Sequence, residues 1–251
     1  FYGLEALAEA GIREVGIIVG DTHEEIRAAV GDGAQFGLEV TYIQQDAPLG
    51  LAHAVLTAAD FLGDDPFVMY LGDNLLNKGI THFVEEFRRE RPAAQILLAR
   101  VPDPQMFGVA ELKDGKVMRL VEKPKEPQSD LALVGVYMFG PAVFESVKRI
   151  KPSRRNELEI TDAIQDLIDR GLEVRPHIVE GWWKDTGKLE DMLEANRLIL
   201  DTIERKLEGT IDGESRIEGK VVLSPGATIE RSVVRGPVVI GAGAKITDAY
   251  V

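Results

Sequence analysis

The chain has 251 residues, of which 45% are hydrophobic and 28% are charged, and its formal net charge is −13. This composition is typical of a soluble globular protein, and the length suits one large domain with a smaller appendage. The negative charge argues against a nucleic-acid-binding surface, and the absence of cysteine excludes disulfides and thiolate metal sites. No apolar run approaches the roughly 20 residues that span a bilayer. We therefore expect a cytoplasmic protein that binds neither nucleic acid nor membrane.

The first hundred residues alternate between predicted helices and predicted strands. Helical spacing of apolar residues marks 1–10, and a β-branched run at 15–19 suits a buried strand. The capping-box sequence at 22–25 predicts a helix that ends near Gly31 or Gly33. Further strands are predicted at 38–43, 67–71 and 94–101, and further helices at 50–61 and 80–90. This alternation predicts an α/β fold with a Rossmann-like, mostly parallel sheet flanked by helices.

The pattern changes after residue 101. Two short strand segments, 109–112 and 116–120, flank Lys113-Asp114-Gly115, which is typical of a tight β-hairpin turn. The apolar stretch 133–139 predicts a return to the main sheet, and 173–180 is predicted to be extended. Helices are predicted at 160–169 and 189–206.

The last forty residues carry a repeat. From about residue 210, aliphatic residues recur every six positions with one step of five, at Ile211, Ile217, Leu223, Ile229, Val234, Ile240 and Ile246. A small or apolar residue follows each by four positions, at Ser215, Val221, Ala227, Val233, Val238, Ala244 and Tyr250. This period is typical of a parallel β-helix, whereas a plain antiparallel sheet would show a period of two. We predict two domains, an α/β domain at 1–207 and the start of a left-handed parallel β-helix at 208–251.

Two acidic residues stand where a strand is predicted to end. Asp73, in Leu71-Gly72-Asp73-Asn74, follows a buried strand, and Asp185, in the segment 183–187, follows an extended one. Two carboxylates that meet at the strand ends of an α/β sheet would form a Mg²⁺ site. The alternatives are an Asp-Asn turn at Asp73 and a helix cap at Asp185. The sequence does not show whether the two residues converge.

A loop before a predicted helix carries groups suited to a nucleotide base. The Gln45 amide both donates and accepts hydrogen bonds, which suits the edge of a pyrimidine. Pro48 and Gly50 follow it, and glycine permits the close approach of a ring or of backbone. The alternative is an ordinary proline-glycine turn that leads into a helix.

Residues on either side of the hairpin suit a sugar phosphate. Lys123 offers a mobile positive charge for the phosphate, and Glu122 can accept hydrogen bonds from sugar hydroxyls. Gly108 would leave space against the sugar ring. The alternative is a surface ion pair beside a proline turn, which contributes little energy.

Two other groups of residues receive no catalytic role. The acids within 157–162 precede a predicted helix and suit capping and support of the site. The four histidines, His23, His53, His82 and His177, do not occur at a metal-ligand spacing.

Taken together and in this order, the motifs resemble those of the glucose-1-phosphate thymidylyltransferases. The likeness covers nearly the whole chain, and the repetitive tail resembles the long form of that family. It rests on Gln45 with 48–52, on 71–74, 107–109, 122–124, 157–162 and 183–187. The resemblance implies a nucleotidyltransferase domain of the GT-A-like kind, followed by the β-helix.

The resemblance also implies roles for individual residues. Asp73 and Asp185 would bind the Mg²⁺ cofactor and, with Lys123, would be catalytic. The nucleotide would contact Gln45, Pro48, Gly50, Gly72 and Asp73. The sugar phosphate would contact Gly108, Glu122, Lys123, Leu133, Val134 and Tyr137.

The implied reaction makes dTDP-glucose and pyrophosphate from glucose 1-phosphate and dTTP, with UTP as a second possible nucleotide. It proceeds by in-line attack on the α-phosphorus, and we expect a homo-oligomer. The family's glycine-rich loop, with an arginine and a lysine, would precede Phe1, so we expect impaired activity without it. The alternatives are a transferase for another nucleotide or sugar phosphate and a non-catalytic regulatory homologue. An acyltransferase role for the β-helix is disfavoured because residues 208–251 contain no histidine.

Overall fold

The computed structural model describes residues 1–251 and divides them into two compact units, Phe1–Asp185 and Thr186–Val251. The first unit holds the α/β part, and the second holds one helix followed by the repeats. The boundary predicted at residues 207 and 208 lies after this helix and remains a prediction. None of the helices combines the length and the apolar character needed to cross a bilayer.

The chain opens with helices and strands close to the predicted ranges. Helix α1 (Tyr2–Glu9) leads into strand β1 (Glu14–Val19), and helix α2 (His23–Val30) leads, through a short 3-10 helix η1 (Ala34–Phe36), to strand β2 (Glu39–Gln44). Strands β1 and β2 pair in parallel, as a strand–helix–strand unit requires. Helix α2 begins after Thr22, but the Thr22 side chain makes no capping hydrogen bond, so the predicted capping box is absent.

The next helix is divided, and the following elements match the prediction. The helix predicted at 50–61 consists of α3 (Leu51–Thr57) and α4 (Ala59–Leu62), which meet at Ala58. The elements that follow are strand β3 (Phe67–Tyr70), strand β4 (Asn74–Leu76), helix α5 (Thr81–Glu90) and strand β5 (Ala94–Arg100).

The main sheet is mixed, which corrects the prediction of a mostly parallel one. Its remaining elements are η2 (Pro104–Met106), β6 (Gly108–Lys113), β7 (Lys116–Glu122), β8 (Leu131–Phe139), α6 (Ala142–Arg149), α7 (Ile160–Asp169) and β9 (Val174–Ile178). The strand order is β7-β6-β8-β5-β9, and β3 also pairs with β8. Strand β8 is antiparallel to β3, β5 and β6, and only β5 and β9 pair in parallel. No crossover helix separates β7 from β8, and parallel strands need such a crossover.

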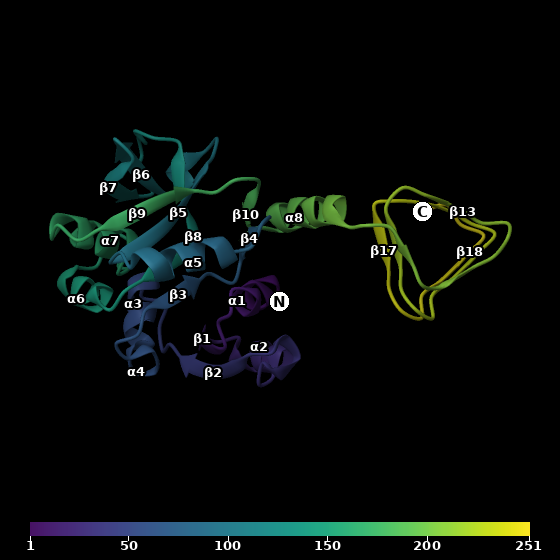
Figure 1. Ribbon diagram of the computed structural model, residues 1–251, viewed down its shortest axis with the longest axis horizontal. Coiled ribbons are helices and arrows are strands. Elements are labelled where there is room, and N and C mark those ends of the chain that lie inside the picture. The colour runs from purple at the N-terminus through teal and green to yellow at the C-terminus, as the bar shows by residue number, and fades with distance from the viewer. The chain divides into compact units, whose positions relative to one another are not determined.

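Strand β8 lies at the centre of the unit, because all nine of its residues are buried. Leu133, Tyr137 and Phe139 contribute to one apolar cluster, with side chains from α3, α6 and α7. Val134 and Val136 contribute to a second cluster, with side chains from α1 and α5. The helices around this sheet (Figure 1) therefore bury both of its faces.

The second unit is a parallel β-helix preceded by helix α8 (Leu189–Thr202). Its strands form three parallel sheets, β11-β14-β17, β12-β15-β18 and β13-β16, which are the sides of the triangular coils in Figure 1. The prediction of a parallel β-helix is thus confirmed. The strands are β11 (Lys206–Leu207), β12 (Thr210–Ile211), β13 (Arg216–Glu218), β14 (Val221–Leu223), β15 (Thr228–Glu230), β16 (Val233–Arg235), β17 (Val238–Ile240) and β18 (Lys245–Thr247).

Not every small or apolar residue that follows the repeated aliphatic residue by four positions is buried. Ser232, rather than Val233, is buried, and its amide donates to Ser215 Oγ at 3.1 Å. Tyr250 is 70% exposed, and the neighbouring Ala249 amide donates to Ser232 Oγ at 3.0 Å. The step of five residues between Ile229 and Val234 accounts for the change at Ser232, because it removes one residue from that side of the coil.

Candidate active site

The two predicted metal ligands lie close together along the backbone. Strand β10 (Trp183–Asp185) pairs antiparallel with β4, and Asp185 lies opposite Asn74. Asp73 directly precedes Asn74, so the two acidic residues stand at the same end of this two-stranded sheet. The pairing of β4 with β10 therefore brings Asp73 and Asp185 together, which the sequence alone did not show.

Asn74 fixes the end of this small sheet. Its side chain is buried, its Nδ2 donates to Asp73 Oδ1 at 2.8 Å, and its Oδ1 accepts from the Gly135 amide at 2.9 Å. The same Oδ1 accepts from the Trp183 indole at 2.7 Å. Burial raises the pKa of Tyr70 to about 12, and the Tyr70 hydroxyl donates to the Asn74 carbonyl at 3.1 Å. Asn74 therefore holds the Asp73 carboxylate against β8 and β10.

Trp183 joins this acidic end to the next predicted motif. Its ring meets Phe107 edge-on, with ring centroids 5.3 Å apart. Phe107 in turn accepts a backbone hydrogen bond of 3.0 Å from the Lys123 amide. Sequence reasoning gave Asn74 and Trp183 no role, and their positions within the two acidic motifs were the only available signal.

Tyr137 shows that the metal end and the sugar-phosphate end of the site are neighbours. Burial raises the pKa of its hydroxyl above the ordinary range. The negative charges of Glu122 and, to a smaller extent, Asp73 raise this pKa further. The charges of both predicted acids therefore affect the pKa of one buried hydroxyl, although the two acids lie in different segments of the chain.

The space beside Gly108 is filled by protein, whereas the sequence predicted space for a sugar ring. A Cβ at position 108 would lie 2.7 Å from Thr161 Cγ2 and 2.8 Å from Leu133 Cδ1. It would also lie 3.2 Å from Glu122 Oε2, because Glu122 is the cross-strand partner of Gly108. The glycine is therefore needed so that these side chains can pack over the strand.

Glu122 lies in a cluster of charges that the sequence did not reveal. Thr161 Oγ1 donates to Glu122 Oε2 at 3.3 Å, and Arg155 donates to Glu122 Oε1 at 3.4 Å. Arg155 also contacts Glu157 at 2.9 Å and the buried Glu159 at 3.6 Å. Arg155 was not singled out from the sequence. Glu159 precedes α7 without a capping hydrogen bond, so its role here is this ion pair rather than a cap.

The environment of Glu122 favours its neutral form. Burial raises the pKa of the Glu122 carboxyl, and the charge of Glu159 raises it further. The charges of Lys123 and Arg155 and the hydrogen bond from Thr161 oppose this shift without cancelling it. Glu122 is thus a half-buried acid whose carboxyl both accepts hydrogen bonds and resists ionisation.

Replacing Glu122 by glutamine is expected to stabilise the protein more at pH 7 than at pH 4. The folded protein binds the Glu122 proton more tightly than the unfolded chain does, because the pKa is raised above its ordinary value of 4.5. This contribution to stability is complete below the unfolded pKa and is lost as the pH rises through the folded pKa. Glutamine stays neutral, and Arg155 keeps Glu157 and Glu159 as partners.

Urea unfolding of the wild type and of Glu122→Gln across this pH range tests the expectation. Glu126 is exposed and follows Glu122 by four residues, after the end of the hairpin, so Glu126→Gln is the matched control. A difference between wild type and Glu122→Gln that does not change with pH would contradict the assignment.

Lys123 is exposed, and its backbone has a φ of 41°. A non-glycine residue in this left-handed region costs about 1–3 kcal/mol, and such strain is often found at functional sites. Its charge lowers the pKa of Glu122, so the two side chains lie near each other. The strained turn presents a cation to solvent beside Glu122.

The predicted base-binding loop is tied to the same region. Gly50 has a φ of 105°, and a Cβ there would lie 2.5 Å from the Leu158 carbonyl oxygen. Leu158 donates to the Leu49 carbonyl at 2.7 Å and accepts from the Ala52 amide at 3.0 Å. The close approach that Gly50 permits is therefore that of backbone, and it places the loop beside the charged segment that contains Glu157.

Gln45 has a partner that sequence reasoning did not assign. Its Nε2 lies 2.8 Å from His53 Nδ1, and because the amide nitrogen is the donor, this ring nitrogen accepts. The contact fixes the orientation of the amide. Pro48 and Gly72 are exposed, and no atom lies within 4 Å of a Cβ placed at Gly72.

The three residues predicted to line the sugar side of the pocket do not share one face. Leu133 and Tyr137 point to the same face of β8, toward Gly108 and Glu122. The Val134 side chain is fully buried in the opposite cluster. Alternate residues of a strand point to opposite faces, so the Val134 side chain cannot line the same surface as the other two.

The donor set at Asp73 and Asp185 fits a hard divalent cation. Both residues offer carboxylate oxygens, which Mg²⁺ prefers, and Mg²⁺ is commonly held by one or two carboxylates together with phosphate oxygens of the substrate. Asp73 is exposed and Asp185 is half-buried, which suits a cation that a substrate must reach.

Comparison with known proteins identifies the family. A family model described as nucleotidyl transferase matches residues 1–202. Glucose-1-phosphate thymidylyltransferases of Streptomyces antibioticus and Streptomyces griseus are 58% and 57% identical to this chain, over 100% of it and 71% of each relative. A solved structure described as a candidate glucose-1-phosphate thymidylyltransferase from Bacillus anthracis, in complex with a sucrose, has a TM-score of 0.75. It is 37% identical, over 82% of this chain and 83% of that one.

The match to the family model covers the unit that contains the acidic strand ends, the hairpin and the base loop. Each of these motifs therefore lies within the region that the family model describes. The chain belongs to the nucleotidyl transferase family, within which it is similar to the glucose-1-phosphate thymidylyltransferases.

Proposed function

We propose that this protein transfers a thymidylyl group from dTTP to glucose 1-phosphate, which yields dTDP-glucose and pyrophosphate. The observation that carries the proposal is the pairing of Asp185 with Asn74, since it brings two carboxylates to one strand end beside the Lys123 turn. The identity of 58% over the full chain to a relative with this name supports the choice of substrates.

The chemistry requires no general base from the protein. A phosphate monoester has a second pKa near 6 and is largely dianionic at neutral pH, so an oxygen of glucose 1-phosphate is already a nucleophile. It attacks the α-phosphorus of dTTP, a new P–O bond forms, and the bond to the β-phosphate oxygen breaks. The displaced pyrophosphate takes the electron pair of that bond.

The residues of the site position the substrates and neutralise charge. Asp73 and Asp185 would hold Mg²⁺, which when bound supplies positive charge to the triphosphate oxygens. Lys123 contributes a second positive charge from the turn beside Glu122, and it serves the phosphate of the sugar. Glu122 accepts hydrogen bonds from sugar hydroxyls.

Recognition of the base belongs to the loop between β2 and α3. The Gln45 amide, oriented by His53, offers its oxygen to the pyrimidine edge. Pro48 and Gly72 contribute exposed surface that a planar base can approach, and Gly50 lets the loop pack against Leu158. Leu133 and Tyr137 support the sugar side from β8.

The same proposal includes a cytoplasmic homo-oligomer. Three large apolar side chains of α8 are exposed, namely Leu189 at 73%, Met192 at 55% and Leu193 at 65%. Exposed apolar groups that gather on one element are typical of contacts with another protein surface.

A nucleotide panel tests the proposed function. Pyrophosphate release is measured with glucose 1-phosphate, Mg²⁺ and each of dTTP, UTP, GTP, CTP and ATP, and binding of each nucleotide is measured by calorimetry. The Streptomyces antibioticus relative serves as the positive control. We expect dTTP to bind tightest and to support the fastest release, followed by UTP.

Two outcomes would contradict the proposal in different ways. Preference for another nucleotide would keep the reaction class and change the substrate. Absence of both binding and turnover, also when a segment with the family's glycine-rich loop is joined ahead of Phe1, would favour the non-catalytic regulatory homologue.

A further inference from the structure

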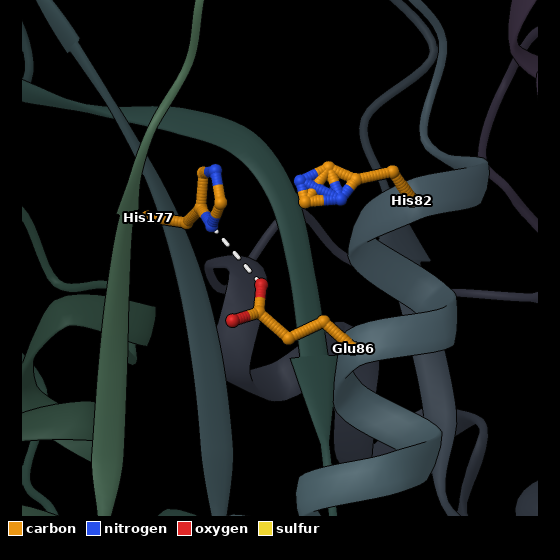
Figure 2. Close-up of side chains that lie close together, drawn as sticks. All are labelled: His82, Glu86 and His177. Atoms are coloured by element: carbon orange, nitrogen blue, oxygen red, sulfur yellow. Dashed lines mark hydrogen bonds and ion pairs between the residues drawn. The ribbon is translucent and has the colours of Figure 1, made fainter.

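Two of the four histidines come together, although their spacing in the sequence gave no sign of it. His82 and Glu86 lie one turn apart on α5, and His177 lies on the neighbouring strand β9. One ligand atom from each of the three residues lies within 4.8 Å of the other two. Figure 2 shows the three side chains directed toward one another across the gap between helix and strand.

The contacts within this cluster are close. His177 Nδ1 lies 3.0 Å from Glu86 Oε2, which is the dashed line in Figure 2. The rings of His82 and His177 meet edge to face, with centroids 5.0 Å apart. The Phe83 ring stacks on His82 with centroids 4.9 Å apart and meets His177 edge to face with centroids 4.7 Å apart. The Phe83 ring therefore packs against both imidazoles.

The backbone beneath the cluster is fixed on both sides. The buried Gln95 donates from Nε2 to the Phe83 carbonyl at 3.1 Å, which ties α5 to strand β5. His177 pairs in parallel with the fully buried Leu97 of the same strand. Rigid supports on both elements are what a precise ligand set requires.

The neighbouring charges leave the cluster acidic. Arg89 and Arg175 lie near Glu86, but Arg89 binds Glu90 at 2.8 Å, and Arg175 binds Glu90 at 3.1 Å and Glu173 at 2.6 Å. Both cations are thus occupied by other carboxylates.

Glu180 is a further acid in the electrostatic surroundings of the two imidazoles. The charges of His177 and His82 help to lower the pKa of Glu180, after a larger effect of its ion pair with Lys78. Glu180 is exposed at the end of the segment that follows β9. Its partner Lys78 occupies this carboxylate, so Glu180 is not one of the proposed ligands.

We propose that His82, Glu86 and His177 form a binding site for a divalent transition metal, with zinc as the preferred ion. Two imidazoles and one carboxylate, with a fourth position open to water, are a common ligand set for zinc. Bonds of about 2.0–2.2 Å in a tetrahedral site place ligand atoms about 3.3 Å apart. The Glu86–His177 separation already matches this spacing, and a rotation of the exposed His82 ring closes the remainder.

The donor chemistry separates this site from the pair Asp73 and Asp185. Imidazole nitrogen selects zinc, nickel or copper, whereas a pair of carboxylates selects magnesium or manganese. A metal bound here joins α5 to β9 and adds a link between helix and sheet. The proposal does not depend on the reaction of the protein, so it stands or fails independently of it.

Calorimetric titration of the chelator-treated protein with zinc chloride tests the site. We expect one zinc ion per chain, no comparable binding of Mg²⁺, and binding that weakens as the pH falls from about 7.5 to about 5.5, because protonated imidazole cannot coordinate. His82→Ala and His177→Ala are each expected to weaken zinc binding at least 10-fold, since even the loss of an outer-shell partner costs about that much.

The histidine His23 provides the matched control. His23 is half-buried and lies on α2, away from the cluster, with its Nε2 3.3 Å from Oε1 of the adjacent Glu24. His23→Ala therefore removes an imidazole beside a carboxylate without changing the cluster. The proposal is overturned if the wild type binds no zinc, or if His82→Ala binds zinc as tightly as the wild type does. His82 is exposed, and circular dichroism of His82→Ala verifies that the fold is kept.

Cobalt(II) gives a second, independent readout. A tetrahedral cobalt site with imidazole and carboxylate ligands absorbs visible light more strongly than the hexaaquo ion. We expect this absorption in the wild type and in His23→Ala, and its loss in His177→Ala. A spectrum that is identical in all three proteins would contradict the site.

Discussion

Asp73→Asn is expected to lower Mg²⁺-dependent pyrophosphate release by at least about 100-fold, the range observed when one group that stabilises transition-state charge is removed. The fold is expected to persist, because asparagine keeps an oxygen that can accept the 2.8 Å hydrogen bond from Asn74 Nδ2. The change removes one negative charge from the end of the β4–β10 pair, where Asp185 alone would remain. Binding of Mg²⁺ with dTTP weakens for the same reason.

The measurement compares turnover, nucleotide binding with and without Mg²⁺, and the urea midpoint. Asp60→Asn is the matched control, since Asp60 is an exposed acid on α4 and lies outside the site. Retained turnover in Asp73→Asn would remove Asp73 from the site. A loss of turnover that is equal in the two variants would indicate a general effect of charge.

The elements that could be predicted from the sequence are those with local causes. The six-residue repeat identified the β-helix because each coil stacks equivalent side chains, as Ile211, Ile229 and Ile246 do. The hairpin followed from its turn, where Asp114 and Gly115 adopt φ values of 51° and 75°. In both cases the signal is local, because each six-residue repeat and the turn itself involve only a few neighbouring residues.

The direction of β8 could not be predicted in this way. Its residues are apolar throughout and buried on both faces, which is equally typical of a central parallel strand. Its direction is set instead by the route of the chain, which reaches β8 from the hairpin without a crossover helix. A short, uniform apolar run contains no information about that route.

The candidate site shows the same division between local and long-range causes. Asp73, Lys123 and Asp185 could be chosen by residue type and by their places at strand ends and turns. Asn74 could not, because its importance comes from partners far along the chain, such as Trp183, which is 109 residues from Asn74. Glu86 and His177 are likewise 91 residues apart.

At this site, individual cations offset part of the negative charge of the chain. Arg155 is shared among Glu122, Glu157 and Glu159, so its charge is largely used to hold these acids in place. Lys123 stands on a strained turn at the surface. In a chain with a net charge of −13, binding of a triphosphate depends on such single cations and on metal ions rather than on the overall field.

Asn74→Ala is expected to lower the free energy of unfolding of the first unit by about 2–5 kcal/mol. The buried Gly135 amide and the half-buried Trp183 indole both lose their acceptor, and an unsatisfied buried donor costs about 1–3 kcal/mol. The Asp73 carboxylate also loses the hydrogen bond from Asn74 Nδ2, so nucleotide binding in the presence of Mg²⁺ is expected to weaken. Urea unfolding followed by tryptophan fluorescence measures the first effect, since both tryptophans, Trp182 and Trp183, lie in this unit.

A double-mutant cycle with Gly135→Ala tests whether Asn74 packs directly against the Gly135 backbone, as its role as an anchor requires. A Cβ at position 135 would lie 2.5 Å from Asn74 Nδ2, so Gly135→Ala alone is expected to destabilise the protein. In the double variant the new methyl group enters the space that Asn74 vacates. The loss of stability in the double variant is therefore expected to be smaller than the sum of the losses in the two single variants. Asn77→Ala, an exposed change next to β4, is the control and is expected to change stability by less than about 0.5 kcal/mol. Strict additivity of the two costs, or a midpoint of Asn74→Ala equal to that of Asn77→Ala, would contradict the role of Asn74 as the residue that holds β4, β8 and β10 together.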